Sequence, residues 1–299
     1  MRRRGEVKLK YAYYPGCIAK TSGKELDAAT RIVAEKMGIQ LIDFPEFSCC
    51  GGAVIDEADV ALNIALNARN LAIAESQRLP ILTVCSTCQG MLSRANKVLR
   101  ENKEMSTKIT NILQKIGMQY NGGTEVKHLL QIIVEDYGLE RLRGLVTYPL
   151  KGLKIAPFYG CHLLRPADVV RFDDPWNPRS LEDLTSALGA EPIRFRGRIE
   201  CCGFPLLFIK ESTANKMAGS LLVEAVEGGA DLIVTPCPLC HVSLDTFQSK
   251  AAKGVKKRVS IPILHLPQLV GLALGIKATA LGLSRHMVSV KDVLKKIER

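Results

Sequence analysis

The chain has 299 residues, of which 47% are hydrophobic, and its formal net charge is +11. Its length and hydrophobic content are sufficient for two ordinary domains, each with a packed core. An aromatic content of 5%, a single tryptophan and the lack of a long basic block argue against nucleic-acid binding. The positive charge therefore favours an anionic ligand or an acidic partner protein.

The apolar runs of the sequence are too short or too interrupted for a membrane span. The longest candidate, residues 266–283, contains Lys277 and predicts a buried helix. The N-terminal Met-Arg-Arg-Arg-Gly leads into a strand-like segment and lacks the apolar core of a signal peptide. These features predict a cytoplasmic protein. Because cytosolic thiols stay reduced, metal ligation is the expected role of grouped cysteines.

In the first half, short apolar runs alternate with segments of helical period. The helix ending at Gly38 places Leu26, Ala29, Val33 and Met37 on one face. The predicted elements are, in chain order, a strand at residues 8–14, this helix, a strand at 39–44, a long helix from about 57 to 77 and a strand at 80–84. A helical, charged segment from about 95 to 147 is expected to bridge the two halves.

The second half repeats this order, with strands predicted at residues 153–159, 192–195 and 231–235 and a helix at 180–188. It carries eight extra residues in a stretch that includes 173–178, where proline and aspartate predict a loop. The predicted fold class is α/β, with two pseudo-symmetric repeats, each a mainly parallel sheet flanked by helices. The domains are expected at 1–150, including the bridging segment, and at 151–299.

All ten cysteines belong to two copies of one five-cysteine pattern, with 34 residues between the double cysteine and the C-x-x-C in both copies. Each group follows a predicted strand. Because the carboxyl ends of parallel strands lie at one edge of a sheet, the five sulfurs of each copy are expected to meet there. The first copy consists of Cys17, Cys49, Cys50, Cys85 and Cys88, and the second of Cys161, Cys201, Cys202, Cys237 and Cys240.

Five thiols in each set favour an iron–sulfur cluster over other centres. Structural zinc is the first alternative, but such a site closes with four ligands. Cys237-Pro-Leu-Cys240-His241 matches covalent haem attachment, yet the first copy has Gln89 in place of the histidine. A thioredoxin-like C-x-x-C would leave three cysteines of each copy without a role.

Four other side chains near the cysteines have both functional and structural interpretations. His162 and His241 each follow a cysteine and could orient a ligand or deliver a proton. Arg165 and Arg171 could attract an anionic substrate. We favour packing or hydrogen bonding for the histidines and solvated loop positions for the arginines, so no catalytic side chain is assigned beyond the cluster ligands.

The repeated C…CC…C-x-x-C pattern, with Cys-Cys-Gly in both copies, resembles the B subunit of heterodisulfide reductase. The resemblance extends over nearly the whole chain, including residues 159–166 and 261–272. It implies two CCG iron–sulfur domains, each binding a noncubane 4Fe-4S cluster through its five cysteines. The implied reaction is reductive cleavage of a disulfide, in which an iron of each cluster captures one sulfur and each cluster supplies one electron.

Two stretches depart from the methanogen enzymes of this family. Gly51-Gly52 stands where a proline is expected, and residues 204–208 replace a run of glycines. Both stretches are expected to line the substrate site, so the departures favour the heterodisulfide-reductase-like complexes of sulfur oxidisers, which act on other sulfur compounds.

The sequence contains no ferredoxin-type cysteine run and no dinucleotide-binding fingerprint, so a partner has to supply or remove electrons. The resemblance implies a C subunit with cubane clusters and a flavin-bearing A subunit. One alternative is an electron-transfer subunit of a flavin-dependent dehydrogenase. The other is a non-enzymatic scaffold in which the metal holds the fold.

Overall fold

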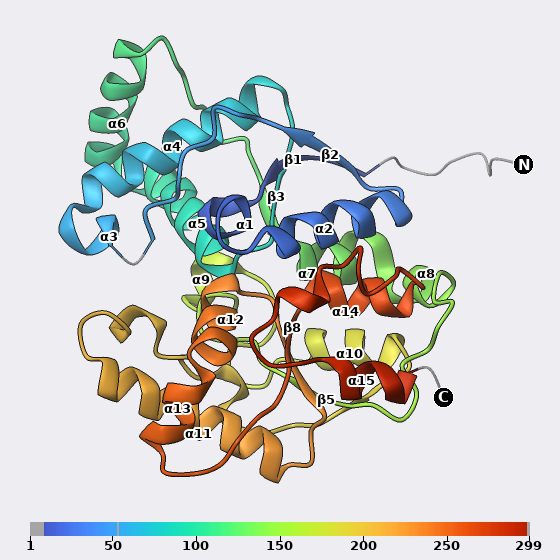
Figure 1. Ribbon diagram of the computed structural model, residues 1–299. Coiled ribbons are helices and arrows are strands. Elements are labelled where there is room, and N and C mark those ends of the chain that lie inside the picture. Colours follow the sequence, from blue (N-terminus) through green and yellow to red (C-terminus); the bar gives the residue numbers. More distant parts are fainter. Residues whose placement is uncertain (1–8, 53, 298–299) are drawn as a thin grey trace, which may run out of the picture.

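The computed structural model describes residues 9–52 and 54–297 and contains two four-stranded sheets (Figure 1). Their strand orders are β2-β1-β3-β4 and β6-β5-β7-β8, and all neighbouring strands are parallel. The predicted α/β class with two repeats is confirmed. The strands are β1 Lys10–Tyr14, β2 Gln40–Asp43, β3 Ile81–Thr83, β4 Val126–His128, β5 Lys154–Pro157, β6 Glu191–Pro192, β7 Leu232–Thr235 and β8 Ile263–His265.

Helices connect the strands, as parallel pairing requires. Those of the first half are α1 Gly16–Lys20, α2 Lys24–Lys36, α3 Ile55–Ala58, α4 Val60–Ser76, α5 Ser86–Glu101, α6 Lys103–Lys115, α7 Leu129–Gln131, the π-helix η1 Ile132–Gly138 and α8 Leu139–Arg143. Those of the second half are α9 Ala167–Val170, α10 Ser180–Ala187, η2 Arg196–Ile199, η3 Phe204–Leu206, α11 Glu211–Glu227, α12 Pro238–His241, the π-helix η4 Val242–Thr246, α13 Gln248–Gly254, α14 Leu266–Ala273, η5 Leu283–Arg285 and α15 Lys291–Ile297.

Four predicted elements need correction. The bridging segment is not wholly helical, because it contains β4, which pairs with β3 and completes the first sheet. The long helix predicted from residue 57 is broken at Asp59, whose carboxylate accepts the Leu62 N–H at 3.0 Å and caps α4. The strand predicted at 192–195 is the two-residue β6, and the buried helix predicted at 266–283 ends at Ala273.

The hydrophobic core is shared by the two halves. Alternate residues of β1 enter two buried clusters, with Tyr11 and Tyr13 in one and Ala12 and Tyr14 in the other, as the period of a strand requires. Both clusters also contain residues of the second half. Helix α14 lies against α2, so the C-terminal part of the chain packs on the first half (Figure 1).

Within the described ranges, no helix has the length and apolar character needed to cross a bilayer. Helix α14 is apolar and wholly buried, as expected from the sequence, but it has only eight residues. Residues 1–5, which were considered for a signal peptide, lie outside the described residues.

Candidate metal centres

The cysteines lie beyond the carboxyl ends of the parallel strands. Cys17 is in α1, directly after β1, and Cys85 follows β3 and precedes α5. The double cysteine Cys49-Cys50 follows β2 in a loop, and Cys88 lies one turn into α5. The short connections from strand to cysteine bring the three groups to one edge of the sheet.

The thiols of the first set are in mutual contact. Sγ of Cys50 lies 3.4 Å from Sγ of Cys88, and Cys17 is hydrogen-bonded to Cys49. The Gly51 N–H donates to Sγ of Cys49 over 3.4 Å. All five cysteines of the set line one cavity of about 410 Å³.

The second set repeats this arrangement. Cys161 is hydrogen-bonded to Cys201, and Cys202 to Cys240. The Gly203 N–H donates to Sγ of Cys201 over 3.4 Å, as Gly51 does in the first set. All five cysteines again line one cavity, which adjoins the first.

Buried polar side chains fix the backbone of each double cysteine. Nδ2 of Asn63 and Nδ2 of Asn67 donate to the Cys50 carbonyl at 3.0 and 2.9 Å. In the second half, the Ser243 hydroxyl donates to the Cys202 carbonyl at 2.7 Å. The sequence analysis missed these residues, since asparagine within a helix gives no sign that it faces inward.

A glycine before the first cysteine of each set lets the backbone approach a sulfur closely. Gly16 and Gly160 have φ values of +78° and +69°, which side chains rarely tolerate. A Cβ at Gly16 would lie 3.0 Å from Sγ of Cys88, and one at Gly160 would lie 3.0 Å from Sγ of Cys240. The glycines therefore belong to the two sites.

The thiols of each set shift one another's pKa. The hydrogen bond between Cys17 and Cys49 raises the pKa of Cys17 and lowers that of Cys49. The same contact between Cys161 and Cys201 has the same effect. Thiolates so close together repel unless a cation neutralises them. Five converging thiols around a shared cavity fit an iron–sulfur cluster, because such clusters bind thiolates.

The two sets meet at the boundary between the halves. The thiols of Cys85 and Cys237 are close enough to shift each other's pKa, and the Thr87 hydroxyl lies 4.0 Å from Sγ of Cys237. Thr87, Phe204 and Leu239 line both cavities. Nothing in the sequence singles out Thr87 or Leu239, because this contact joins segments about 150 positions apart.

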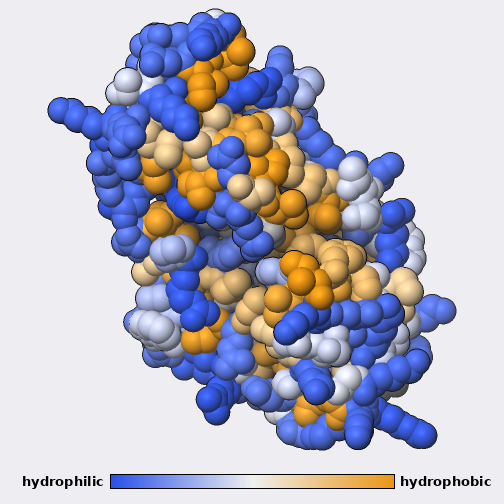
Figure 2. Space-filling model, turned by 90° about the vertical axis from the view of Figure 1, so that its left-hand side faces the viewer, coloured by the Kyte–Doolittle hydropathy of each residue, from blue (hydrophilic) through white to orange (hydrophobic). Residues whose placement is uncertain are grey.

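The lining surface of the two cavities is mainly apolar. No lysine, arginine, aspartate or glutamate of the described ranges lines either cavity. Beside Phe204, the side chains of Phe208 and Ile209 are 79% and 75% exposed. On the face drawn in Figure 2, apolar side chains gather on both sides of a hollow between the halves.

The histidines and arginines flagged from the sequence occupy different places. Nδ1 of His162 lies 3.0 Å from the Thr87 hydroxyl and His162 lines the second cavity, whereas His241 is buried. The Arg165 guanidinium donates to the Ile199 carbonyl, and that of Arg171 donates to the Asp168 carbonyl at 3.1 Å. Both arginines therefore bind backbone groups outside the cavities.

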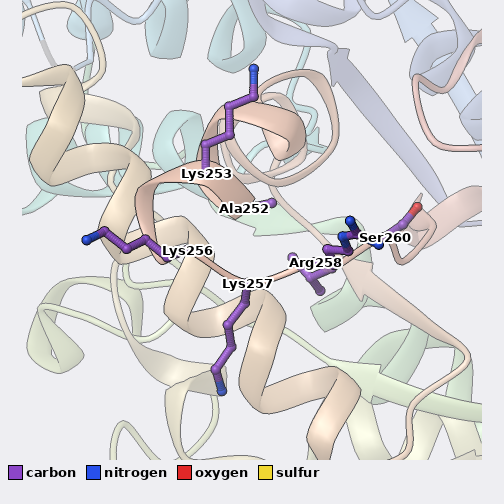
Figure 3. A pocket seen from close by; sticks show the side chains of 7 residues that line it. Ala252, Lys253, Lys256, Lys257, Arg258 and Ser260 are labelled. Atoms are coloured by element: carbon purple, nitrogen blue, oxygen red, sulfur yellow. The ribbon is translucent and has the colours of Figure 1, made fainter.

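A separate hollow of about 650 Å³ is lined by residues 252, 253 and 256–260 and contains no cysteine. Lys253, Lys256 and Lys257 point away from one another there (Figure 3). Because its lysines do not converge, this hollow is a basic surface and does not form a pocket around one anion.

Comparisons with known proteins agree with this geometry. The model of the CCG family, a cysteine-rich domain, matches residues 11–93 and 155–245. A protein of Wolinella succinogenes, named 8-methylmenaquinol:fumarate reductase membrane anchor subunit, is 40% identical over 94% of this chain and 98% of its own length. The B subunit of the ferredoxin:CoB-CoM heterodisulfide reductase of Methanosarcina mazei is 32% identical over 96% of this chain and 97% of its own length.

A protein of Archaeoglobus profundus, named for its likeness to the B subunit of heterodisulfide reductase, is 34% identical over 89% of this chain and 91% of its own length. The crystal structure of a hypothetical protein from Helicobacter pylori shares the fold, with a TM-score of 0.76 at 20% identity over 95% of this chain and 53% of that one. The family match and the relatives named for heterodisulfide reductase imply that the chain binds iron–sulfur clusters. With two copies of the domain and relatives of this similarity over nearly its full length, the chain belongs to the CCG family that includes the B subunit of heterodisulfide reductase.

Proposed function

We propose that the chain is a redox subunit of an oxidoreductase complex, in which two noncubane 4Fe-4S clusters face one substrate site. The observation that supports this most is that each set of five cysteines lines its own cavity and that the two cavities adjoin. The proposed ligands are Cys17, Cys49, Cys50, Cys85 and Cys88 for one cluster and Cys161, Cys201, Cys202, Cys237 and Cys240 for the other.

Two adjoining centres suit a two-electron substrate. An iron–sulfur cluster supplies or accepts one electron at a time. In this chain the two cavities share Thr87, Phe204 and Leu239 in their linings, so a substrate at their boundary can reach both ligand sets. The Thr87 hydroxyl and the His162 imidazole are two polar groups of the lining that can orient it there.

The lining of the cavities favours an uncharged substrate. A substrate rich in carboxylate, phosphate or sulfonate groups would need lysines or arginines, and none among the described residues lines the cavities. A quinol satisfies this condition. Its oxidation to the quinone releases two electrons and two protons, and the electrons would pass to partner subunits.

The proposed function is therefore that of the iron–sulfur subunit of a quinol-linked, flavin-dependent oxidoreductase. The relative named 8-methylmenaquinol:fumarate reductase membrane anchor subunit supports it, since it is 40% identical to this chain. The proposed partners are a flavin-bearing protein and a protein with ferredoxin-type clusters, and the +11 net charge suits an acidic docking face.

Cleavage of a disulfide is the second candidate function. It is supported by the relatives named for heterodisulfide reductase, at 32% and 34% identity, and by the pair of adjoining cysteine sets. Sulfur chemistry of the kind predicted from the sequence, including that of the sulfur-oxidiser complexes, would need an uncharged or protein-bound sulfur compound in this cavity.

The first test is metal analysis of anaerobically purified protein. Two four-iron clusters give about eight iron and eight sulfide per chain. The Cys50→Ala and Cys202→Ala variants should each lose about half of the iron, because each removes a ligand of one set. Full iron content in both variants would refute the assignment of five ligands to each cluster.

The second test distinguishes the two substrates by EPR of the clusters and by rapid mixing. Menadiol should reduce the clusters, whereas dithiothreitol and its oxidised form should leave their signals unchanged. The Phe204→Ala variant should slow reduction, while Ile209→Ala, on the exposed surface nearby, should not. Signals that respond only to the thiol would favour disulfide cleavage, and signals that respond to neither would refute both substrates.

A further inference from the structure

Three of the five histidines gather in one cluster of the second half. His241 ends α12, His265 ends β8 and His286 directly follows η5. The rings of His241 and His265 stack with centroids 3.9 Å apart, and the ring of His286 lies 4.8 Å from that of His241. The proposed redox site does not use this cluster, because none of the three lines either cavity.

Donor atoms of this cluster converge with a carboxylate. Nε2 of His241 lies 2.8 Å from Nδ1 of His286 and 3.2 Å from the Ile263 carbonyl oxygen. A bound ion would replace the contact between His241 and this carbonyl. Asp245 lies one turn after His241, in the π-helix η4, and one donor atom from each of the three residues falls within 4.8 Å of the others. Local π-helical turns often occur at functional sites, because they change the direction of side chains along a helix.

A hydrogen bond from His286 to Gln268 leaves the other ring nitrogen of His286, Nδ1, facing His241. Nε2–H of His286 donates to Oε1 of Gln268 at 3.0 Å, so Nδ1 keeps its lone pair. Oε1 of Gln268 is itself fixed, since it also accepts the His265 N–H at 2.9 Å. Metal-binding histidines usually have such a partner on the second nitrogen, which sets the tautomer and the orientation of the ring.

The Asp245 carboxylate is buried, and no ion pair to it is formed by the part of the chain that the structure describes. Its side chain accepts the N–H groups of Met287 and Val288 at 2.8 and 3.2 Å, and Asp245 is 3% exposed. No lysine or arginine within residues 9–52 and 54–297 forms an ion pair with it. Because a buried charge is costly unless it is compensated, this carboxylate favours a cation beside it.

We propose that His241, Asp245 and His286 bind one divalent zinc ion, independently of the redox site. Two imidazoles and a carboxylate are ordinary zinc ligands, and water can complete the four. With bonds of about 2.0–2.2 Å, the ligand atoms of a tetrahedral ion lie about 3.3–3.6 Å apart. The two imidazole nitrogens, 2.8 Å apart, therefore have to separate slightly, and the most distant donor atom has to move inward. The ion would tie the C-terminal tail to α12, which begins directly after Cys237 and contains Cys240, and to η4.

The first half offers an internal comparison. His128 occupies the position of His265 in the strand register, since each pairs with a threonine of the neighbouring strand. At the position of His241 stands Gln89, whose amide donates to Oε1 of Gln131 at 3.1 Å. Because an amide pair offers no imidazole ligand, we expect one zinc ion per chain.

Zinc and iron analysis together with zinc K-edge absorption tests the proposal. Whole, anaerobically purified protein equilibrated with zinc sulfate should retain one zinc per chain with nitrogen and oxygen neighbours at about 2.0–2.1 Å. His286→Gln and Asp245→Asn should weaken zinc binding at least 10-fold while the iron content stays unchanged. Met287→Ala, at the 70%-exposed neighbouring position, is the matched control and should keep the zinc.

Three results would overturn the zinc site: a zinc content near zero, zinc with sulfur neighbours at about 2.3 Å, or unchanged zinc in a folded His286→Gln variant. Sulfur neighbours would instead place zinc in a cysteine set, which contradicts the two-cluster proposal. The iron content of each variant therefore distinguishes failure of the zinc site from failure of the redox site.

Discussion

Replacement of Gly16 by alanine tests how closely the backbone must approach the first cysteine set. At φ +78°, a residue with a side chain lowers the free energy of unfolding by about 1–2 kcal/mol relative to glycine. In addition, the new Cβ would lie 3.0 Å from Sγ of Cys88, closer than nine in ten real Cβ contacts. That sulfur lies 3.4 Å from Sγ of Cys50, so its displacement disturbs two proposed ligands.

The chain offers a matched control for the backbone strain. Gly38 has φ +72°, and beyond its chain neighbours no heavy atom of the described residues lies within 4 Å of a Cβ built on it. Gly38→Ala should therefore lose about the same 1–2 kcal/mol in urea unfolding while it keeps all its iron. Gly16→Ala should lose this stability and also about half of the iron.

The repeat provides a second pair of variants. Gly160→Ala places a Cβ 3.0 Å from Sγ of Cys240, and Gly229 is its control, with φ +83° and open space around the Cβ. Iron and sulfide per chain and the urea midpoint are measured for all four variants. If Gly16→Ala and Gly160→Ala keep as much iron as their controls, the argument from close approach to the sulfur is wrong.

Three further variants test contacts around the site. Asn67→Ala removes one of the two donors to the Cys50 carbonyl, and it should cost about 1 kcal/mol in urea unfolding and accelerate iron loss to a chelator. Tyr159→Phe leaves the Leu181 N–H without its 2.8 Å acceptor and should cost about 1–3 kcal/mol, whereas Tyr148→Phe, at an exposed position, should cost nothing measurable. Burial tends to raise the pKa of Glu25, but the His265 imidazole, 3.7 Å from the carboxylate, and the Arg285 guanidinium, which donates to it at 2.8 Å, outweigh this effect and lower the pKa to about 2. The resulting stabilisation should be complete above about pH 4.3, the usual value in an unfolded chain, and should disappear as the pH falls toward 2. Unfolding curves of Glu25→Gln should lack this part of the pH dependence, and an unchanged dependence would contradict the assignment.

The sequence was sufficient for features that depend on local pattern. The periodicity of the apolar residues predicted β1, α2, β5 and β7 within a few residues, because burial of one helix face or strand leaves a regular trace. The duplicated cysteines, each after a strand, predicted where the thiols would gather. The thiols gather there because the carboxyl ends of parallel strands lie at one edge of the sheet.

The sequence was not sufficient for short elements that depend on pairing. Strands β4 and β8 have three residues each, which is too few for a period, and their place is set by hydrogen bonds to β3 and β7. In the same way, nothing local distinguishes the inward-facing Asn63 and Asn67 from surface residues.

The sequence by itself determined that this protein has two repeats and two sets of five cysteines, because these follow from residue order and spacing. Only the tertiary structure decided that the cavities share Thr87, Phe204 and Leu239, that their lining carries no acidic residue, lysine or arginine among the described residues, and that three histidines meet beside Asp245. Such contacts join segments distant in the chain, and they form only when the two halves pack around their shared cores.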